Sequence, residues 1–341
     1  MRFGIAGAGV IATTHAKLID SIPEAELVAI ADEIPDRAQA LTAKHGGEAL
    51  TSVEELVARD DIDTISVCLP SGLHAYAAVQ ALDAGKNVII EKPIDVSLEA
   101  ADRIIEAERR SGKTAAVISQ RRFQPSFAYL RRAIEDGKLG KVTSGISEST
   151  FWRSQEYYDS GGWRGTWELD GGGALMNQGV HALDLIVWML GEPVEVSAYF
   201  DILAHERIEV EDTLSASVKF ANGAIGTITA TTAAYPGRTV RLSVNGTEGV
   251  AVIESEALQY LHTRSGEDGK DESGNQIDQA PEAFGENSIH GAHRAQYLDF
   301  MAAVNEGRAP GVTTADGRRA LALVLAIYES ARAGGTPVKL K

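Results

Sequence analysis

The chain opens on Phe3-Gly4-Ile5-Ala6-Gly7-Ala8-Gly9-Val10-Ile11-Ala12, in which four residues typical of a buried strand run directly into a glycine-rich turn and an amphipathic segment. The spacing Gly-x-Gly-x-x-Ala is typical of the place where the first strand of a parallel sheet gives way to a helix. Gly7 allows a tight turn, Gly9 lets a ligand approach the backbone, and Ala12 permits close packing of helix on strand. This stretch therefore predicts an α/β fold with a ligand site at the start of its first helix.

Short β-branched runs alternate with amphipathic segments through the first part of the chain, up to about residue 121. This alternation is typical of a parallel sheet covered by helices. Helix boundaries are marked by Pro35 and by Ser52 with Glu55, a capping box. The strand candidates are Phe3–Ala6, Leu27–Ala31, Thr64–Leu69, Val88–Ile90 and Ala115–Ser119.

The pattern changes after Arg121, and strand-like runs joined by turns such as Asn222-Gly223 predict an antiparallel sheet. We therefore predict two domains, residues 1–121 with a Rossmann-type parallel sheet and residues 122–341 with an open-faced, mostly antiparallel sheet flanked by helices. Residues 265–287 are polar and glycine-rich, and we expect a loop there. The expected helices of the second part are Pro125–Asp136, Gly173–Leu190, Ile289–Asn305 and Asp316–Ala331, and its expected strands lie in Val142–Thr150 and between Val194 and Leu261.

The composition excludes several classes of protein. Hydrophobic residues make up 44% of the 341, but no apolar run approaches the roughly 18 residues needed to cross a bilayer. Met1-Arg2 leads straight into the first strand, so we expect no signal peptide, no membrane partner and a cytoplasmic location. The 48 acidic side chains against 32 basic ones give a net charge of -16, which repels nucleic acid. Cys68 is the only cysteine and lies in an apolar run, so we interpret it as a buried thiol and assign no metal ligands.

Asp32 ends the second predicted strand, where an acid following the glycine motif meets the hydroxyls of an adenine ribose. The motif and this acid together predict a nicotinamide dinucleotide. Glu33 follows directly and no arginine occurs before Arg37, so two acids would repel a 2′-phosphate and NAD is favoured over NADP. The residues assigned to the dinucleotide on this basis are Gly7, Gly9, Val10, Ile11 and Asp32.

Glu91-Lys92-Pro93 follows the apolar run Asn87-Val88-Ile89-Ile90 and places a charged amine at the carboxyl end of a predicted buried strand. Ligands of open α/β sheets bind beyond these strand ends, so Lys92 is expected to point into the site. The alternative is a lysine that extends its amine to solvent.

Several segments carry a family resemblance: the glycine motif, Pro70-Ser71-Gly72-Leu73-His74, Ala84–Pro93 and Gly171-Gly172-Gly173-Ala174-Leu175-Met176-Asn177-Gln178-Gly179-Val180-His181-Ala182-Leu183-Asp184. Together they resemble the glucose-fructose oxidoreductase, inositol dehydrogenase and rhizopine-catabolism (Gfo/Idh/MocA) family. The resemblance implies NAD(P)-linked oxidation or reduction of a hydroxyl on a sugar or cyclitol, and a second domain that often packs sheet to sheet in dimers or tetramers. Pro70, Ser71, His74, Glu91 and Lys92 are accordingly assigned to the cofactor side of the site.

The resemblance also implies roles for three residues. Lys92 matches the family's motif lysine and His181 its catalytic histidine, whereas Asn177 stands where many members have an aspartate. An amide can position a hydroxyl but cannot accept its proton, so acid-base work is expected from His181, Lys92 or both. Histidine, with an ordinary pKa of about 6.5, suits proton exchange near neutrality, and lysine suits polarisation of the oxygen. The alternative for His181 is a core histidine satisfied by Asp184, one helical turn later.

An aromatic-rich segment between Phe151 and Trp167 can stack on the apolar faces of sugar rings. The alternative is a loop held down by its own aromatic side chains. The candidate substrate-binding residues are Arg122, Trp152, Arg153, Trp163, Asn177 and His181.

The sequence therefore predicts an NAD-dependent oxidoreductase acting on a ring hydroxyl of a sugar, sugar derivative or cyclitol such as inositol, as a homodimer or homotetramer. One alternative is a glycosidase or epimerase that retains NAD and uses transient oxidation. The other is a regulator on the same scaffold that senses sugar or NAD without catalysis.

The acids Asp32 and Glu33 lead to a prediction about cofactor preference. At equal concentrations, the purified protein should turn over NADH faster than NADPH, because the two carboxylates repel a 2′-phosphate. Initial rates with the two cofactors measure this directly. Faster turnover of NADPH would contradict the assignment.

Overall fold

The computed structural model describes residues 1–238, 240–264 and 288–340. The loop expected at residues 265–287 lies outside the described residues. The predicted domain limits, residues 1–121 and 122–341, stay a prediction. The chain divides into two compact units, of which unit 1 comprises Met1–Ser119, Glu168–Gly171 and His293–Leu321, and unit 2 comprises Gln120–Trp167, Gly172–Ala292 and Ala322–Lys341.

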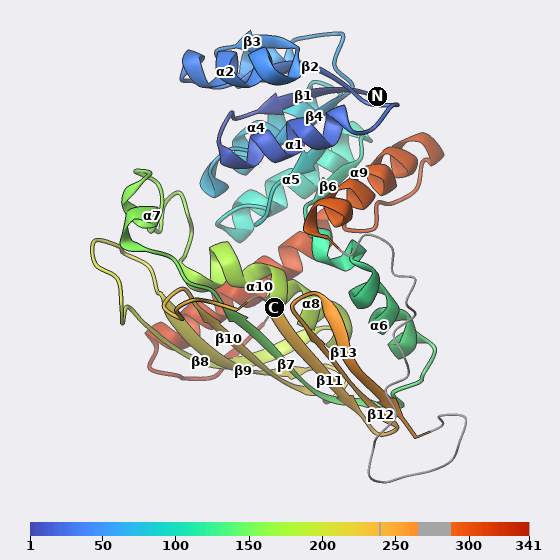
Figure 1. The fold of residues 1–341 in the computed structure, drawn as a ribbon, viewed down its shortest axis with the longest axis vertical. Coiled ribbons are helices and arrows are strands. Elements are labelled where there is room, and N and C mark those ends of the chain that lie inside the picture. The colour runs from blue at the N-terminus through green and yellow to red at the C-terminus, as the bar shows by residue number, and fades with distance from the viewer. Residues whose placement is uncertain (239, 265–287, 341) are drawn as a thin grey trace. The chain divides into compact units, whose positions relative to one another are not determined.

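Unit 1 contains a six-stranded parallel sheet in the order β3-β2-β1-β4-β5-β6 (Figure 1). The strand order reverses between β1 and β4, and in open parallel sheets ligands bind at the carboxyl ends of the strands flanking such a reversal. All four residues of β4 are buried, as expected for a strand with helices on both faces. The strands are β1 (Arg2–Ala6), β2 (Glu26–Ala31), β3 (Glu48–Leu50), β4 (Thr64–Val67), β5 (Asn87–Ile90) and β6 (Ala115–Val117).

Two helices of unit 1 begin at the residues that the sequence marks. Ser52 accepts a hydrogen bond from the Glu55 amide (3.2 Å) at the start of α3, and α2 begins at Pro35. The core includes Phe3 and Ile5 of β1 packed with Tyr297 and Phe300 of α9. These helices are α1 (Val10–Asp20), α2 (Pro35–His45), α3 (Val53–Val57), η1 (Ser71–Leu73), α4 (His74–Asp83), α5 (Leu98–Ser111) and α9 (Ile289–Glu306, from His293 onward in this unit).

Unit 2 is built on an eight-stranded sheet in the order β13-β12-β11-β7-β10-β9-β8-β14. Its pairs are antiparallel except for β7 with β10, which run parallel. Buried and outward-facing residues alternate along β9, so the sheet has one packed and one open face. The strands are β7 (Val142–Thr150), β8 (Pro193–Asp201), β9 (Thr213–Phe220), β10 (Ile225–Thr231), β11 (Val240–Gly246), β12 (Gly249–Glu254), β13 (Ala257–Thr263) and β14 (Val338–Lys339).

Helix α8 (Val180–Leu190) packs on β7 and β11 and covers the packed face of this sheet. No helix of the described ranges 1–238, 240–264 and 288–340 combines the length and hydropathy needed to span a membrane. The other helical segments of unit 2 are η2 (Gln120–Phe123), α6 (Pro125–Glu135), α7 (Gln155–Asp159), η3 (Ala174–Gly179) and α10 (Thr314–Arg332), whose residues up to Leu321 belong to unit 1.

The predicted fold class is confirmed, but the structure differs from the prediction in several elements. The strands β3 and β14 and the helix α7 were not predicted, because they are only three, two and five residues long and too short to show a periodic pattern. The single helix expected over Gly173–Leu190 begins instead with the π-helical turn η3. Its first amides, which have no partner within the helix, bond to Glu211: the Ala174 amide donates to the Glu211 carbonyl (2.9 Å).

The close approach of Glu211 to η3 makes Gly173 a test of the fold. A Cβ at Gly173 would lie 1.8 Å from the Glu211 carbonyl oxygen, so Gly173→Ala should lower the free energy of unfolding by about 3 kcal/mol or more. Gly162→Ala is the matched control, because nothing lies within 4 Å of its Cβ position. Denaturant unfolding of both variants measures the difference. Equal stabilities would contradict this packing.

Candidate active site

The glycine turn between β1 and α1 has the shape that its sequence predicts. Gly7 has φ +95°, and a Cβ there would lie 2.7 Å from the Cys68 carbonyl, so only glycine fits. At Gly9 nothing lies within 4 Å of the Cβ position, so packing within the protein does not require a glycine. The missing side chain leaves room for a ligand beside the backbone.

Asp32 holds this turn through its carboxylate. Its Oδ2 accepts a hydrogen bond from the Ala8 amide (2.7 Å) and its Oδ1 one from the Ile34 amide (2.9 Å). The acid that the sequence assigns to the ribose therefore also orders the loop in front of α1.

The start of α1 fits a dinucleotide pyrophosphate. No side chain caps this helix and its first turn contains no acid, so its amide groups favour an anion. Val10, in the first turn, is 81% exposed, which is unusual for a large apolar side chain. The residues that would hold NAD here are Gly9, Val10 and Ile11 at the pyrophosphate and Asp32 at the ribose.

Pro70, Ser71 and His74 follow β4, the strand across the switch point from β1. The His74 ring lies between two backbone carbonyls, with Nδ1 2.7 Å from Pro93 O and Nε2 3.0 Å from Leu69 O. Burial lowers the pKa of His74 below its ordinary value, against the effect of these carbonyls. His74 thus joins the loop after β4 to the loop after β5.

Glu91 lies at the end of β5 and is buried, with internal partners on both carboxylate oxygens. Oε1 is 2.9 Å from His15 Nε2 of α1, and Oε2 accepts the Lys92 amide (3.1 Å). His15 Nδ1 is in turn 2.7 Å from Ser66 Oγ and 2.6 Å from the Tyr297 hydroxyl of α9. This network, which we call the Glu91 network, ties the backbone of Lys92 to α1, β4 and α9.

The charges in the Glu91 network support one another. Burial alone would raise the pKa of Glu91, but the hydrogen bond and charge of His15 lower it well below its ordinary value. Burial alone would lower the pKa of His15, yet Cys68 and Tyr297 beside its ring, together with the hydrogen bond to Glu91, raise it well above the usual value. Both shifts favour a buried ion pair.

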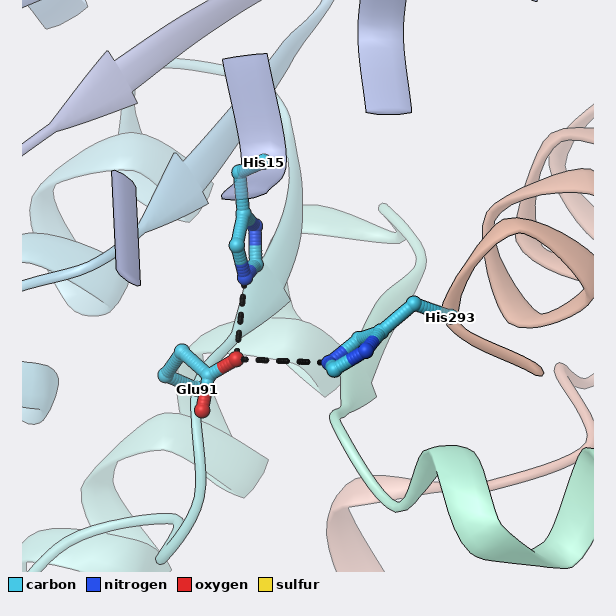
Figure 2. A group of neighbouring side chains, drawn as sticks. All are labelled: His15, Glu91 and His293. Carbon is cyan, nitrogen blue, oxygen red and sulfur yellow. Dashed lines mark hydrogen bonds and ion pairs between the residues drawn. The ribbon is translucent and has the colours of Figure 1, made fainter. Parts of the chain in front are cut away.

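His293 of α9 adds a second histidine to this cluster, with Nε2 4.0 Å from Glu91 Oε1 (Figure 2). The ligand atoms of His15, Glu91 and His293 all lie within 4.8 Å of one another, and two histidines with a carboxylate is a donor set that zinc uses. The 2.9 Å contact between His15 and Glu91 is an ordinary hydrogen-bonded ion pair, so the geometry is explained without a metal.

Asn177 and His181 belong to η3 and to the first turn of α8 in unit 2, and both are partly buried. The start of this helical segment is held by Glu211, whose carboxylate accepts the amides of Gly173 (2.9 Å) and Leu175 (2.8 Å) and the Tyr328 hydroxyl (2.9 Å). A buried carboxylate thus caps the helix that carries two predicted site residues.

Burial raises the pKa of Glu211 to about 7, against the three hydrogen bonds, which lower it. Glu211 was not predicted as a site residue. The signal was the acid pair Glu211-Asp212 directly before the strand Thr213–Phe220, an unusual place for two carboxylates to be buried.

Arg122 is paired with Asp184 rather than exposed. Its Nε and Nη2 donate to the two Asp184 oxygens (2.8 and 2.6 Å), and both side chains are buried. The guanidinium also lies over the Trp188 ring, 5.4 Å from its centroid. This bidentate pair fixes η2 to α8, one turn beyond His181.

The aromatic segment between Phe151 and Trp167 is partly held by contacts among its own side chains, which is the alternative that its sequence left open. Trp152 is 40% exposed and packs edge-on against Tyr235. Trp163 is covered by the Arg164 guanidinium, 4.8 Å from its ring centroid. Arg153 donates to the Gln178 side chain (2.9 Å), and Gln178 in turn donates to Asn177.

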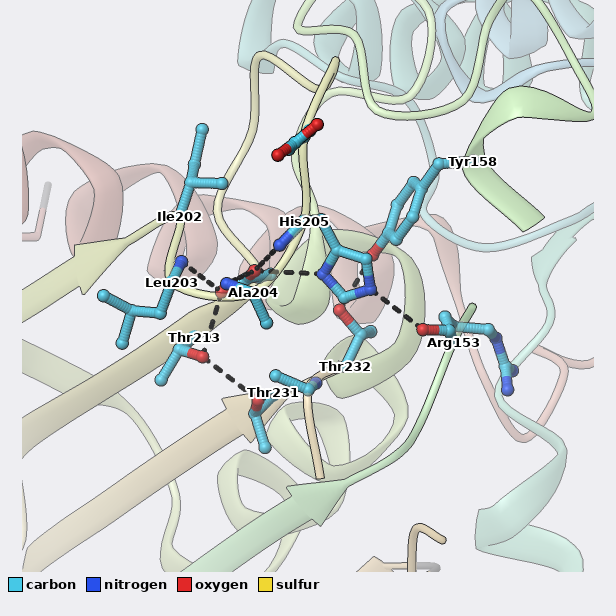
Figure 3. A network of polar contacts seen from close by, with 12 residues as sticks. Arg153, Tyr158, Ile202, Leu203, Ala204, His205, Thr213, Thr231 and Thr232 are labelled. Atoms are coloured by element: carbon cyan, nitrogen blue, oxygen red, sulfur yellow. Dashed lines mark hydrogen bonds and ion pairs between the residues drawn. The ribbon is translucent and has the colours of Figure 1, made fainter. Parts of the chain in front are cut away.

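A polar network fixes the loop between β8 and β9 to this segment (Figure 3). The Asp212 carboxylate accepts the amides of Leu203, Ala204 and His205, and lies 3.0 Å from His205 Nδ1. His205 Nε2 donates to the Arg153 carbonyl (2.8 Å).

Family models match both parts of the chain. The NAD-binding Rossmann fold of an oxidoreductase family matches residues 1–119, and the GFO/IDH/MocA C-terminal domain matches residues 127–252. The chain belongs to the GFO/IDH/MocA family. The predicted resemblance, the NAD cofactor and the class of oxidoreductase are thereby confirmed.

Members of this family with names and structures are similar over most of the chain. The inositol 2-dehydrogenase of Rhizobium meliloti (strain 1021) is 28% identical over 97% of this chain and 96% of the relative. The D-glucoside 3-dehydrogenase of Escherichia coli (strain K12) is 31% identical over 66% of this chain and 68% of the relative. The structure of the WlbA dehydrogenase from Bordetella pertussis in complex with NADH and UDP-GlcNAcA is 32% identical, with a TM-score of 0.91 and coverage of 100% of this chain and 98% of that one.

Within each unit, the structure brings together some of the predicted site residues of this family member. In unit 1 the turn at Gly7 and Gly9, Asp32, the loop at Pro70 and Ser71 and the Glu91-Lys92 pair all lie at carboxyl ends of strands. In unit 2, Arg153 reaches Asn177 through Gln178. The roles of these residues stay predictions. His15, Gln178, Glu211 and Tyr297 were not predicted, because their importance depends on contacts far apart in the sequence.

The raised pKa of Glu211 leads to a prediction about stability and pH. Folding raises this pKa from 4.5 to about 7 and so favours the protonated acid. The contribution to stability is fully present below pH 4.5 and is lost as pH rises through about 7. Relative to Glu211→Gln, the wild-type free energy of unfolding should therefore fall by up to about 3 kcal/mol between about pH 5 and about pH 8.

Denaturant unfolding at several pH values measures this difference. Glu209→Gln is the control, because Glu209 is exposed and lies two residues away, and its difference from wild type should not depend on pH in this way. A wild-type minus Glu211→Gln difference that stays constant or rises with pH would show that Glu211 folds as a carboxylate.

Proposed function

We propose that the protein is an NAD-dependent dehydrogenase that reversibly oxidises a ring hydroxyl of a sugar, sugar derivative or cyclitol. The observation that carries this proposal is the position of Lys92, whose backbone the buried Glu91 network fixes at the end of β5 in a dinucleotide-binding unit. Because the network restrains the loop that carries Lys92, we assign this lysine to ligand binding rather than to extension of its amine into solvent.

The chemistry divides among three side chains. NAD, when bound, would supply the hydride-transfer chemistry. His181 takes the hydroxyl proton during oxidation and returns it during reduction. The Lys92 ammonium donates a hydrogen bond to the reacting oxygen and stabilises the negative charge that develops on it. Asn177 positions the same part of the substrate.

The substrate class is supported by the relatives. Two are named for oxidation at a ring position, of inositol and of a D-glucoside, and the WlbA dehydrogenase was crystallised with a nucleotide sugar. Trp152, Trp163 and the aromatic segment around them supply apolar faces of the kind that sugar rings contact. Arg122 acts by pairing with Asp184 and so fixing α8, on which His181 lies.

Glu91 acts in this proposal as a positioning residue for Lys92. His74, in the same way, restrains the loops that follow β4 and β5 by bonding to a carbonyl of each. Both residues are nearly inaccessible to solvent, which suits a supporting role beside the cofactor.

We further propose assembly into a dimer or tetramer through the open face of the eight-stranded sheet. Large apolar side chains on its strands are unusually exposed, among them Ile146 (40%), Tyr199 (67%) and Ile225 (56%). Burying such residues against a second copy would stabilise association.

A screen of cyclitols, free sugars and nucleotide sugars for reduction of NAD tests the proposed function. Wild-type protein should accumulate NADH with at least one polyol. Conversion of substrate without net NADH would instead indicate the NAD-retaining glycosidase or epimerase, and tight NAD binding without any turnover would indicate the regulator.

The role of His181 is tested by substitution. His181→Ala should lower kcat by about 100-fold or more, because the hydroxyl proton loses its acceptor. His290→Ala is the control, since His290 is an exposed histidine in the first turn of α9. Steady-state kinetics of both variants and melting temperatures measure the effect. Wild-type kcat in His181→Ala would exclude His181 as the acid-base group.

A further inference from the structure

Asn177 is the first of three side chains joined in a row. Gln178 Nε2 donates to Asn177 Oδ1 (2.9 Å), and Arg153 Nη2 donates to Gln178 Oε1 (2.9 Å). All three residues lie in unit 2, and Asn177 and Gln178 are adjacent in η3.

The arginine decides the direction of both hydrogen bonds. A guanidinium has only donors, so the group of Gln178 that faces Arg153 must be its oxygen. The Gln178 amide therefore turns its nitrogen towards Asn177, and a nitrogen donor requires the Asn177 oxygen opposite it. The two amides, whose oxygen and nitrogen ends are otherwise interchangeable in shape, are ordered by one fixed charge.

Arg153 is itself held on several sides. Its guanidinium donates to the Trp152 carbonyl (3.1 Å) and lies over the Tyr157 and Phe151 rings, 5.1 and 5.7 Å from their centroids. Its backbone amide donates to the Thr232 carbonyl (2.9 Å), and its carbonyl accepts from His205 (2.8 Å; Figure 3).

We propose that Arg153 and Gln178 fix the polarity of Asn177, so that Asn177 meets the substrate as a hydrogen-bond donor and selects an oxygen acceptor there. This inference rests on the proposed function, in which Asn177 contacts the substrate. Arg153 and Gln178 are positioning residues that act through Asn177.

The proposal has a consequence for the two forms of the substrate. An alcohol oxygen both donates and accepts, whereas a ketone oxygen only accepts. A fixed donor at Asn177 binds both forms, and an acceptor at the same place would bind the alcohol and repel the ketone. Donor polarity thus lets one side chain serve both directions of a reversible oxidation.

Gln178→Glu reverses this polarity with little change in shape. A carboxylate only accepts, so it keeps the bond from Arg153 and obliges Asn177 to turn its nitrogen inward and its oxygen towards the substrate. The ratio of KM for the ketone to KM for the alcohol should rise by about tenfold or more, the effect of about one hydrogen bond. Asn177→Asp, which also presents an acceptor, should shift the ratio in the same direction.

Two controls separate polarity from other effects. Arg153→Lys keeps a side chain that can only donate, so the ratio of the two KM values should stay at the wild-type value. Arg153→Met removes the donor, so the ratio should change. Gln155→Glu adds the same charge to α7, on the neighbouring segment, and should leave the ratio unchanged. An unchanged ratio in Gln178→Glu, or an equal rise in Gln155→Glu, would overturn the proposal.

Melting temperatures test the polarity without any substrate, and so separate its failure from failure of the proposed function. Asn177→Asp should lower the melting temperature less than Asn177→Leu, because its carboxylate still accepts from Gln178 whereas leucine does not. Combining it with Gln178→Glu places two carboxylates in contact, and the loss should exceed the sum of the single losses. A loss in Asn177→Asp as large as in Asn177→Leu, or larger, would show that Gln178 turns its oxygen towards residue 177, and the proposed polarity would be wrong.

Discussion

The buried pair of Glu91 and His15 is the interaction on which the organisation of unit 1 depends. It joins the helix that follows the glycine turn to the end of β5, and through Tyr297, 282 residues from His15 in sequence, it reaches α9. Removing one partner of a buried ion pair typically costs about 3–5 kcal/mol, because the other charge is left without compensation. Here the same carboxylate also accepts the amide of Lys92. Stability and the position of the candidate catalytic lysine therefore depend on one group.

Unit 2 uses a buried carboxylate in a comparable way. Glu211 accepts two amides at the start of η3, and Tyr328 of α10 donates to the same group. The segment that carries Lys92 and the segment that carries Asn177 and His181 are thus each held by a carboxylate that accepts backbone amides. Both carboxylates, Glu91 and Glu211, are buried. The two differ in charge, since His15 favours the ionised form of Glu91, whereas burial favours the protonated form of Glu211. A carboxyl group can accept backbone amides whether it is ionised or protonated, but only the ionised group compensates the charge of a buried histidine.

The parts of the site that could be predicted from the sequence are those with local physical causes. Gly7 follows from a backbone angle that other residues rarely adopt, and Lys92 stood out because a charge ended an apolar strand. Asp32 was predicted at the ribose, and the structure adds that it also binds the Ala8 amide. Arg153 was predicted to bind substrate, and the structure adds that its guanidinium donates to Gln178. No local pattern distinguishes these two uses of an arginine.

The sequence by itself determined that the first sheet is parallel, as well as the dinucleotide motif and the family, because strand periodicity and glycine spacing are properties of neighbouring residues. Only the tertiary structure decided which buried polar groups support the site. His15, Gln178 and Glu211 gain their roles from partners on other elements, and the desolvation that shifts the pKa of Glu211 exists only once the chain is packed around it. The direction of the Asn177 amide belongs to the same class, since it depends on a guanidinium that folding brings within hydrogen-bond distance of Gln178.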